Sequence, residues 1–338
     1  MLPAVFSLFQ DSVNKGPKIS HPPSYADVLA AARRLEGHAI KTPLLRSDAL
    51  DTRLGKQIWF KAECLQKKNA FKYRGAFNRL SAMSAAERAR GVVAFSSGNH
   101  AQGVSCAAKE LGMDAIIVMP EDAPKVKTDG VLADGATIVS YDRNTESREE
   151  IAAAIAQRDG RTLVPSFDDP WIIAGQGTIG IELAEAEPEF DAMITCLGGG
   201  GMCAGISLAL TELSPQTRIF GAEPENYNDH QLSLRAGVRT KLSATPPSLC
   251  DAILTPQPGA LTWPINFKSL SDVYTVSDEE CLYAIKVTHE ELGVTLEPGG
   301  AAAMAAVLAG NLPDDVKTVA VILSGGNVDP SIFQRALQ

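Results

Sequence analysis

Long hydrophobic runs and basic clusters are both missing from this 338-residue sequence. No segment approaches the ~20 consecutive apolar residues that a membrane-spanning helix needs, so we expect no membrane partner. The net charge is −9, and no stripe of Lys and Arg interleaved with aromatic residues occurs. Counterion release would have little to act on, which argues against nucleic acid and leaves small molecules as the expected partners.

Cysteine pairs at metal-binding spacing are also absent. The six cysteines are scattered, without a C-x-x-C motif, at Cys64, Cys106, Cys196, Cys203, Cys250 and Cys281. This pattern predicts no cysteine-bound metal and favours reduced thiols in the cytoplasm. The opening MLPAVFSLFQ lacks the basic region of a signal peptide, so residues 1–20 are predicted to be an N-terminal tail.

Short apolar segments alternate with helical patterns along most of the chain. The predicted strands are 92–95, 115–119, 136–140, 192–197, 218–222 and 318–323. The predicted helices are 101–111, 148–157, one that begins near 202, and 278–291. This alternation is typical of an α/β fold with parallel sheets. The proline-rich stretch 245–258 is predicted to be a surface loop.

A lysine in the segment from Asn69 to Ala76 is the first candidate for covalent chemistry. Phe71 and Lys72 lie at its centre. A lysine amine can hold an aldehyde cofactor as an imine when desolvation or a neighbouring cation lowers its pKa. Alone, the segment also fits a helix start with one solvated lysine.

Two polar or glycine-rich turns follow predicted strands and precede predicted helices, where backbone N–H groups bind anions. One is Ser96-Ser97-Gly98-Asn99-His100, which suits a carboxylate, although simple helix capping explains the same residues. The other is Gly198-Gly199-Gly200-Gly201-Met202, which suits a phosphate. The dinucleotide motif G-x-G-x-x-G is met there only in degenerate form, and a tight turn without a ligand is the alternative.

A fourth cluster, Ser324-Gly325-Gly326-Asn327, follows the last predicted strand. Ligands bind at the carboxyl ends of strands in open α/β sheets. A serine hydroxyl at that edge can hydrogen-bond an unprotonated pyridine nitrogen. A serine in a β-turn is the alternative interpretation.

These four clusters occur in the order used by one family, which the chain resembles from about residue 25 to residue 328. This family is the serine/threonine dehydratase and serine racemase group of fold-type II (tryptophan synthase β-like) pyridoxal-phosphate enzymes. The resemblance implies two open-sheet α/β lobes with the cofactor in the cleft between them. Residues 21–90 and 169–338 would form a large cofactor-binding domain, and residues 91–168 a small mobile domain that closes on the substrate.

The resemblance also implies a role for each cluster. Lys72 would carry pyridoxal 5'-phosphate as a Schiff base. The other cofactor-binding residues would be Phe71 beside the ring, Asn99 at the phenolic oxygen, Gly198, Gly199, Gly200, Gly201 and Met202 at the phosphate, Ser324 at the ring nitrogen, and Glu297. The substrate carboxylate would bind to Ser96, Ser97, Asn99 and His100.

A divalent-cation site is implied by the resemblance of the segment Ala222-Glu223-Pro224. The carboxylates of Glu223 and Asp229 and the carbonyl of Tyr227 would bind Mg²⁺, or Mn²⁺ or Ca²⁺. From spacing alone, these residues fit a loop with two solvated acids.

The implied reaction is loss of water from a β-hydroxy-α-amino acid to give a 2-oxo acid and ammonia. Serine, threonine and 3-hydroxyaspartate all stay open as substrates, because Asn69-Ala70 replaces the family's usual Gly-Ser or Gly-Ala and Phe167 stands where relatives place a polar residue. Arg148 is a candidate to bind a second carboxylate, with an exposed arginine at a helix start as the alternative.

Three other functions stay open. Lys72 and Ser97 on opposite faces of the substrate would allow serine racemisation, alone or beside elimination. A β-replacement transferase of the cysteine-synthase type shares the fold, although the S-S-G-N-H and S-G-G-N motifs argue against it. A non-enzymatic nucleotide sensor would use the degenerate glycine loop. Relatives suggest a homodimer.

Overall fold

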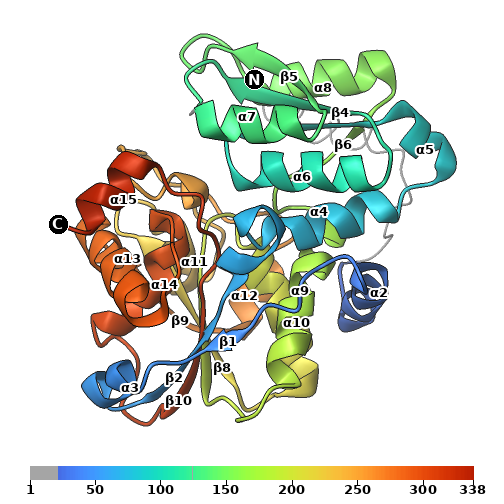
Figure 1. Cartoon of the computed structure of the whole chain (residues 1–338). Coiled ribbons are helices and arrows are strands. Elements are labelled where there is room, and N and C mark those ends of the chain that lie inside the picture. Colours follow the sequence, from blue (N-terminus) through green and yellow to red (C-terminus); the bar gives the residue numbers. More distant parts are fainter. Residues whose placement is uncertain (1–21, 124) are drawn as a thin grey trace.

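A computed structural model describes residues 22–123 and 125–338, whose strands form two separate sheets (Figure 1). The predicted tail, residues 1–20, lies outside these described residues.

The larger sheet has six strands among the described residues, in the order β1-β2-β10-β7-β8-β9. Their bounds are β1 (Leu44–Leu45), β2 (Gln57–Lys61), β10 (Thr318–Ile322), β7 (Ala192–Cys196), β8 (Arg218–Pro224) and β9 (Leu270–Val276). All neighbours are parallel except β1 and β2, which are antiparallel. All five residues of β7 are buried, as expected for a parallel strand that is covered on both faces.

The smaller sheet, in the order β5-β4-β3-β6, is parallel throughout. Its strands are β3 (Val92–Phe95), β4 (Ala115–Pro120), β5 (Thr137–Tyr141) and β6 (Thr162–Leu163), and its helices are α6 (Asn99–Glu110), α7 (Lys125–Ala133) and α8 (Arg148–Asp159). Successive strand residues point to opposite faces. Val92 and Ala94 therefore pack with the apolar residues of α6, and Val93 packs with those of α8.

The remaining helices cover the larger sheet or connect the two sheets. They are α2 (Tyr25–Leu35), α3 (Asp48–Leu54), α4 (Lys72–Ser81), α5 (Ala85–Arg90), α9 (Pro170–Ala184), α10 (Gly201–Leu213), α11 (Asp229–Ala236), α12 (Trp263–Ser269), α13 (Asp278–Leu292), α14 (Pro298–Leu308) and α15 (Pro330–Ala336). Three 3₁₀ segments among the described residues are η1 (Glu63–Leu65), η2 (Lys67–Asn69) and η3 (Asp251–Ile253).

Close helix packing fixes α4, the helix that begins with Lys72, against α9. A Cβ added to Gly175 of α9 would lie 2.8 Å from the carbonyl oxygen of Arg74, and one on Gly75 would lie 2.9 Å from the carbonyl oxygen of Ile172. Both contacts are closer than real Cβ atoms allow, so glycine is needed where these helices cross. The position of Lys72 therefore depends on this crossing.

The predicted α/β architecture is confirmed, and each predicted strand and helix overlaps an observed one. The stretch 245–258 is a loop with exposed residues at 245–247, as predicted, but part of it is buried. This segment contains η3, Cys250 is fully buried, and residues 251–258 line the main cavity of the described structure. None of the helices in the described ranges combines the length and apolar character needed to cross a membrane.

Candidate active site

A cavity of about 1660 Å³ is lined by residues from both sheets and their connections. It brings together every residue that the sequence predicts for cofactor and carboxylate binding: Phe71, Lys72, Ser96, Ser97, Asn99, His100, Gly198, Gly199, Gly200, Gly201, Met202, Glu297 and Ser324. The four sequence clusters thus form one site.

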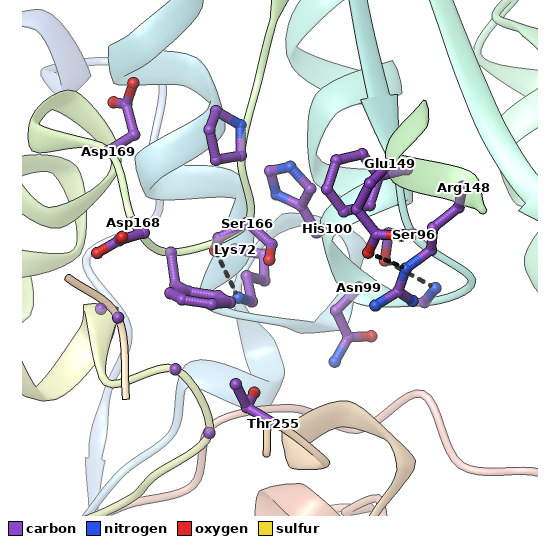
Figure 2. Close-up of a pocket in the computed structure, with 18 of the residues that line it drawn as sticks. Lys72, Ser96, Asn99, His100, Arg148, Glu149, Ser166, Asp168, Asp169 and Thr255 are labelled. Atoms are coloured by element: carbon purple, nitrogen blue, oxygen red, sulfur yellow. Dashed lines mark hydrogen bonds and ion pairs between the residues drawn. The ribbon is translucent and has the colours of Figure 1, made fainter. Parts of the chain in front are cut away.

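Lys72 is the first residue of α4 and reaches into this cavity. Its Nζ donates a hydrogen bond to the carbonyl oxygen of Ser166 at 2.8 Å and lies 5.0 Å from the centroid of the Phe71 ring (Figure 2). Burial lowers the pKa of Lys72 to about 8. A sizeable fraction of the amine is therefore neutral near physiological pH, as nucleophilic attack on an aldehyde requires.

The glycine loop joins β7 to the N-terminus of α10. Gly200 has φ of +86°, a conformation that side chains other than glycine rarely adopt. A Cβ on Gly199 would collide with the ring of Phe167, so the loop can pass beneath that ring only without a side chain. The hydroxyl of Thr262 donates to the Gly199 carbonyl at 2.6 Å and supports the turn from outside. Free N–H groups at this helix start suit a phosphate.

Ser324 follows β10 and is buried beside Cys196, the last residue of β7. The thiol of Cys196 donates to the Ser324 hydroxyl oxygen at 3.3 Å. The hydroxyl hydrogen of Ser324 therefore stays available for an acceptor in the cavity, such as a pyridine nitrogen.

A chain of amides links Asn99 at the start of α6 to the larger lobe. The Asn99 amide donates to the Glu297 carboxylate, and the Asn327 amide donates to Asn99 Oδ1 at 2.7 Å. Burial, followed by the charge of Asp251, raises the pKa of Glu297 to about 7. Glu297 Oε2 is buried without a hydrogen-bond partner among the described residues, so this carboxyl group keeps one oxygen for a ligand.

Asn69 extends the same chain and explains one departure from the family pattern. Its φ is +53°, in the left-handed region, where the family's usual glycine is unstrained and Asn is among the better-tolerated other residues. Its amide donates to Asn327 Oδ1 at 3.3 Å. The substitution therefore keeps the backbone conformation and adds a contact to the network around Asn99.

His100 is fixed in a way that limits its role. Because the Val164 carbonyl can only accept, the ring contact of 2.9 Å places a hydrogen on His100 Nε2. Burial, followed by the charge of Lys72, lowers the pKa of His100 to about 3. The ring is therefore neutral and has no second N–H, so His100 can offer a carboxylate only its backbone N–H at the start of α6.

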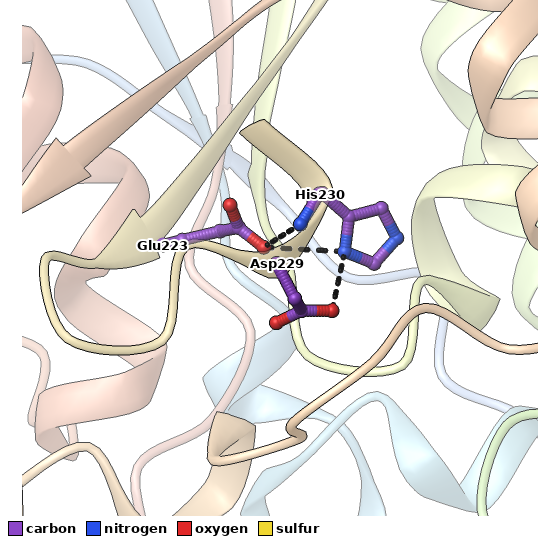
Figure 3. Close-up of side chains that lie close together, drawn as sticks. All are labelled: Glu223, Asp229 and His230. Atoms are coloured by element: carbon purple, nitrogen blue, oxygen red, sulfur yellow. Dashed lines mark hydrogen bonds and ion pairs between the residues drawn. The ribbon is translucent and has the colours of Figure 1, made fainter. Parts of the chain in front are cut away.

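Two predicted metal ligands also lie together, away from the cavity. Figure 3 shows Glu223, Asp229 and His230 around one point, and their ligand atoms lie within 4.8 Å of one another. Asp229 Oδ2 is buried and makes no hydrogen bond in the described part of the chain, and its ion-pair contact with His230 Nδ1 is 3.5 Å long. Tyr227 lies in the turn between β8 and α11. Two buried carboxylates, one with an oxygen that makes no hydrogen bond, suit a hard divalent cation.

Other residues at the site were not singled out from the sequence. Ser166 supplies the carbonyl that holds Lys72, and Lys127 of α7 forms an ion pair with Asp251 of η3 at 2.8 Å. Both partners of the ion pair line the cavity. Lys127 has the sequence neighbourhood of a surface lysine, and its burial depends on packing between segments more than 120 residues apart.

The fold and this cavity define a class of protein: a two-lobed α/β enzyme whose buried amine and glycine-lined helix start suit an aldehyde cofactor with a phosphate group. The family model described as "Pyridoxal-phosphate dependent enzyme" matches residues 35–325. The chain belongs to this family, which confirms the predicted family, cofactor and fold class.

Individual relatives are similar over nearly their whole length. The L-threo-3-hydroxyaspartate ammonia-lyase of Pseudomonas sp is 45% identical over 308 residues, which are 90% of this chain and 96% of that protein. The serine racemase of Schizosaccharomyces pombe is 40% identical over 307 residues, 91% of this chain and 95% of that protein. The crystal structure of serine racemase from Dictyostelium discoideum superposes with a TM-score of 0.85 at 36% identity and covers 91% of this chain and 100% of that one. The predicted lyase class is thus confirmed.

Proposed function

We propose that this enzyme is an ammonia-lyase that acts on L-threo-3-hydroxyaspartate and yields oxaloacetate and ammonia. One observation carries the choice of substrate: Arg148 lines the same cavity as Lys72 and the carboxylate-binding turn. The relative named for this substrate, at 45% identity, also supports it. Serine and threonine have no second carboxylate for Arg148 to bind.

The cavity fits pyridoxal phosphate at three places. Lys72 would hold the aldehyde carbon, the glycine loop would hold the phosphate, and Ser324 would face the ring nitrogen. Asn99, Phe71 and Glu297 would complete the pocket around the ring. When bound, the cofactor supplies an electron-withdrawing ring that stabilises negative charge at the substrate's α-carbon.

The chain's own residues would carry out the remaining steps. Ser96, Ser97 and Asn99 would bind the α-carboxylate, together with the backbone N–H of His100. Lys72 Nζ would remove the α-proton, since its lowered pKa makes it a base near neutral pH. This proton balances the hydroxide that leaves the β-carbon, so that water is lost overall. The product then takes up water, releases ammonia and becomes the 2-oxo acid.

Arg148 is suited to the second carboxylate. It begins α8, and its guanidinium carbon lies 5.5 Å from the centroid of the Phe95 ring, which holds it over the cavity wall. Figure 2 shows Arg148 on the same wall as Ser96, with Asn99 between it and Lys72. Its Nε donates to Glu149 at 2.9 Å, which leaves the terminal nitrogens for a bidentate contact.

A divalent cation, with Mg²⁺ as the first candidate, is proposed at Glu223, Asp229 and the carbonyl of Tyr227. The buried Asp229 Oδ2 supports it, because this oxygen makes no hydrogen bond in the described structure. The family resemblance supports a homodimer. The six cysteines, all free and buried in the described structure, suit the reducing cytoplasm.

The test begins with the absorbance spectrum of the purified protein. We expect a band from the lysine-bound cofactor that is lost in Lys72→Ala, and release of ammonia and 2-oxo acid from L-threo-3-hydroxyaspartate in preference to L-serine and L-threonine. Lys41→Ala is the control, because Lys41 is exposed and paired with Glu185. Absence of the band would reject pyridoxal phosphate as the cofactor. A preference for serine would reject L-threo-3-hydroxyaspartate as the substrate.

Racemisation is the second candidate, supported by Ser97 on the cavity wall and by the relative named serine racemase. Ser97 would exchange a proton on the face opposite Lys72. Formation of D-serine from L-serine that stops in Ser97→Ala, while elimination is weakened by the loss of one carboxylate contact but continues, would establish it.

A further inference from the structure

A buried imidazole lies between the carboxylate pair and the glycine loop. His230 has no exposed surface. On one side, its Nδ1 lies 3.2 Å from Glu223 Oε1 and 3.5 Å from Asp229 Oδ2 (Figure 3). Glu223 also accepts the backbone N–H groups of His230 and Gln231, which fixes its carboxylate at the start of α11. The imidazole is therefore anchored on this side by two acids.

The other edge of the ring faces the glycine loop. His230 Nε2 lies 3.4 Å from the amide nitrogen of Asn266, which donates to the Gly200 carbonyl at 3.2 Å. A Cβ added to Gly200 would lie 2.6 Å from His230 Nε2 and would collide with the Asn266 amide. Both side chains therefore press directly against the backbone that bends into α10.

The Asn266 amide is fixed between the loop and the ring. The Gly200 carbonyl can only accept, so it fixes the Asn266 amide with its NH₂ group toward the loop. His230 Nε2 faces this amide, and Nδ1 faces the two acids. Asn266 is also fully buried, so water cannot take over these bonds.

The imidazole of His230 contacts the two acids on one side and the Asn266 amide on the other. The distances of 3.2 and 3.5 Å on the acid side and 3.4 Å on the loop side all exceed the usual 2.9 to 3.0 Å of such hydrogen bonds. A force that relieves one side lets the ring shorten its contact on the other. A cation that takes over the oxygens of Glu223 and Asp229 would act in this way.

We propose that His230 is a positioning residue that couples the Glu223–Asp229 pair to the glycine loop, so that a divalent cation at the pair tightens cofactor binding at the loop. The proposal rests on the proposed function, in which the loop holds the cofactor phosphate and the pair holds the cation. Coupling of this kind is reciprocal, because each ligand changes the affinity of the other by the same factor.

The test measures the dissociation constant of pyridoxal phosphate from its absorbance band, in excess Mg²⁺ and in excess chelator. In the unaltered enzyme we expect Mg²⁺ to tighten binding by about tenfold. His230→Asn keeps an amide near the acids and His230→Gln keeps one near the loop, but neither spans both. In both variants the ratio of the two dissociation constants should fall to about one, with loss of the coupling. Thermal unfolding confirms that each variant is folded.

His289→Asn is the matched control. His289 packs edge-on against Phe333 at 5.2 Å between ring centroids and is not part of the cavity wall, so the variant should keep the ratio of the unaltered enzyme. Equal ratios in the unaltered enzyme and the His230 variants, including a ratio of one throughout, would overturn the coupling alone. An unaltered enzyme that forms no band would overturn the proposed function and, with it, the coupling.

Discussion

At the scale of the single residue, Lys72 combines a functional need with a cost in stability. Its pKa is lowered by burial from the ordinary 10.5 to about 8, so the folded state disfavours the charged amine. The direction of the effect on stability follows from the difference between the pKa values of Lys72 in the folded and unfolded states. The unfolded chain binds this proton more tightly, and the resulting destabilisation is full below pH 8 and disappears as the pH rises from 8 to above 10.5.

Lys72→Met should therefore stabilise the cofactor-free protein at pH 7 by about 2–3 kcal/mol while abolishing activity. The gain should be much smaller at pH 10. Urea unfolding of the two proteins at pH 7 and at pH 10 measures the gain in the free energy of unfolding at each pH. Equal gains at both values would show that the effect comes from packing of the methionine and not from the charge.

Arg148 allows a second prediction about one residue. Arg148→Met should lower kcat/KM for L-threo-3-hydroxyaspartate by about tenfold and leave that for serine nearly unchanged, because only the first substrate has a β-carboxylate. The expected loss in kcat/KM is modest because Arg148 is partly exposed. Arg143→Met is the control, since Arg143 pairs with Asp122 on the same lobe, outside the cavity wall. An unchanged preference in Arg148→Met would reject the second-carboxylate site.

The sequence was informative about residues with local signals and silent about those whose position depends on distant packing. Asn99, Gly200 and Ser324 stand in short motifs after apolar strands, Lys72 stands in a short motif without a preceding predicted strand, and all four line one cavity. His230, in contrast, is one of five histidines and has no motif of its own. Its importance arises only when α11, α12 and the glycine loop meet.

At the scale of the helix and strand, six strands were predictable because they form short apolar runs. The buried parallel strand β2, with Gln57 and Lys61 at its ends, was not predicted. β3 and β7 match their predicted bounds to within a residue. β9 was not predicted, because its sequence LSDVYTV exposes polar residues at an edge of the sheet.

The glycine loop gives the prediction for this scale. Gly200→Ala should weaken cofactor binding by at least about tenfold. It should also destabilise the fold by about 1–3 kcal/mol, because the new Cβ meets Asn266 and His230 and the residue keeps a positive φ.

Gly293→Ala separates the effect of backbone strain at a positive φ from the effect of the collision with Asn266 and His230. Gly293 ends α13 with φ of +67°, and a Cβ there would meet nothing within 4 Å. This control should lose stability through backbone strain alone and keep its cofactor affinity. Equal cofactor affinities in Gly200→Ala and Gly293→Ala would show that the space beneath the loop does not matter.

At the scale of the whole molecule, the two lobes meet through apolar packing of α4 against α6 and through polar contacts beside the cavity. The Asn99–Glu297 hydrogen bond and the Lys127–Asp251 ion pair each join an element of the smaller lobe to one of the larger lobe. The family resemblance implied two lobes, but it did not predict these contacts, since they depend on the relative placement of the lobes. We propose that residues 91–168 close over the substrate and that these contacts hold the closed state.

Lys127→Met tests this closure. Lys127 is buried while Asp251 is half exposed, so the pair contributes modestly, and we expect KM for the amino acid to rise by about fivefold with little change in global stability. Amide hydrogens of α7 should exchange faster, because the helix loses its contact across the cavity. Lys125→Met is the control on the same helix, since Lys125 is exposed and pairs with Asp129 within α7. If the two variants behave alike, the Lys127–Asp251 contact does not hold the lobes together.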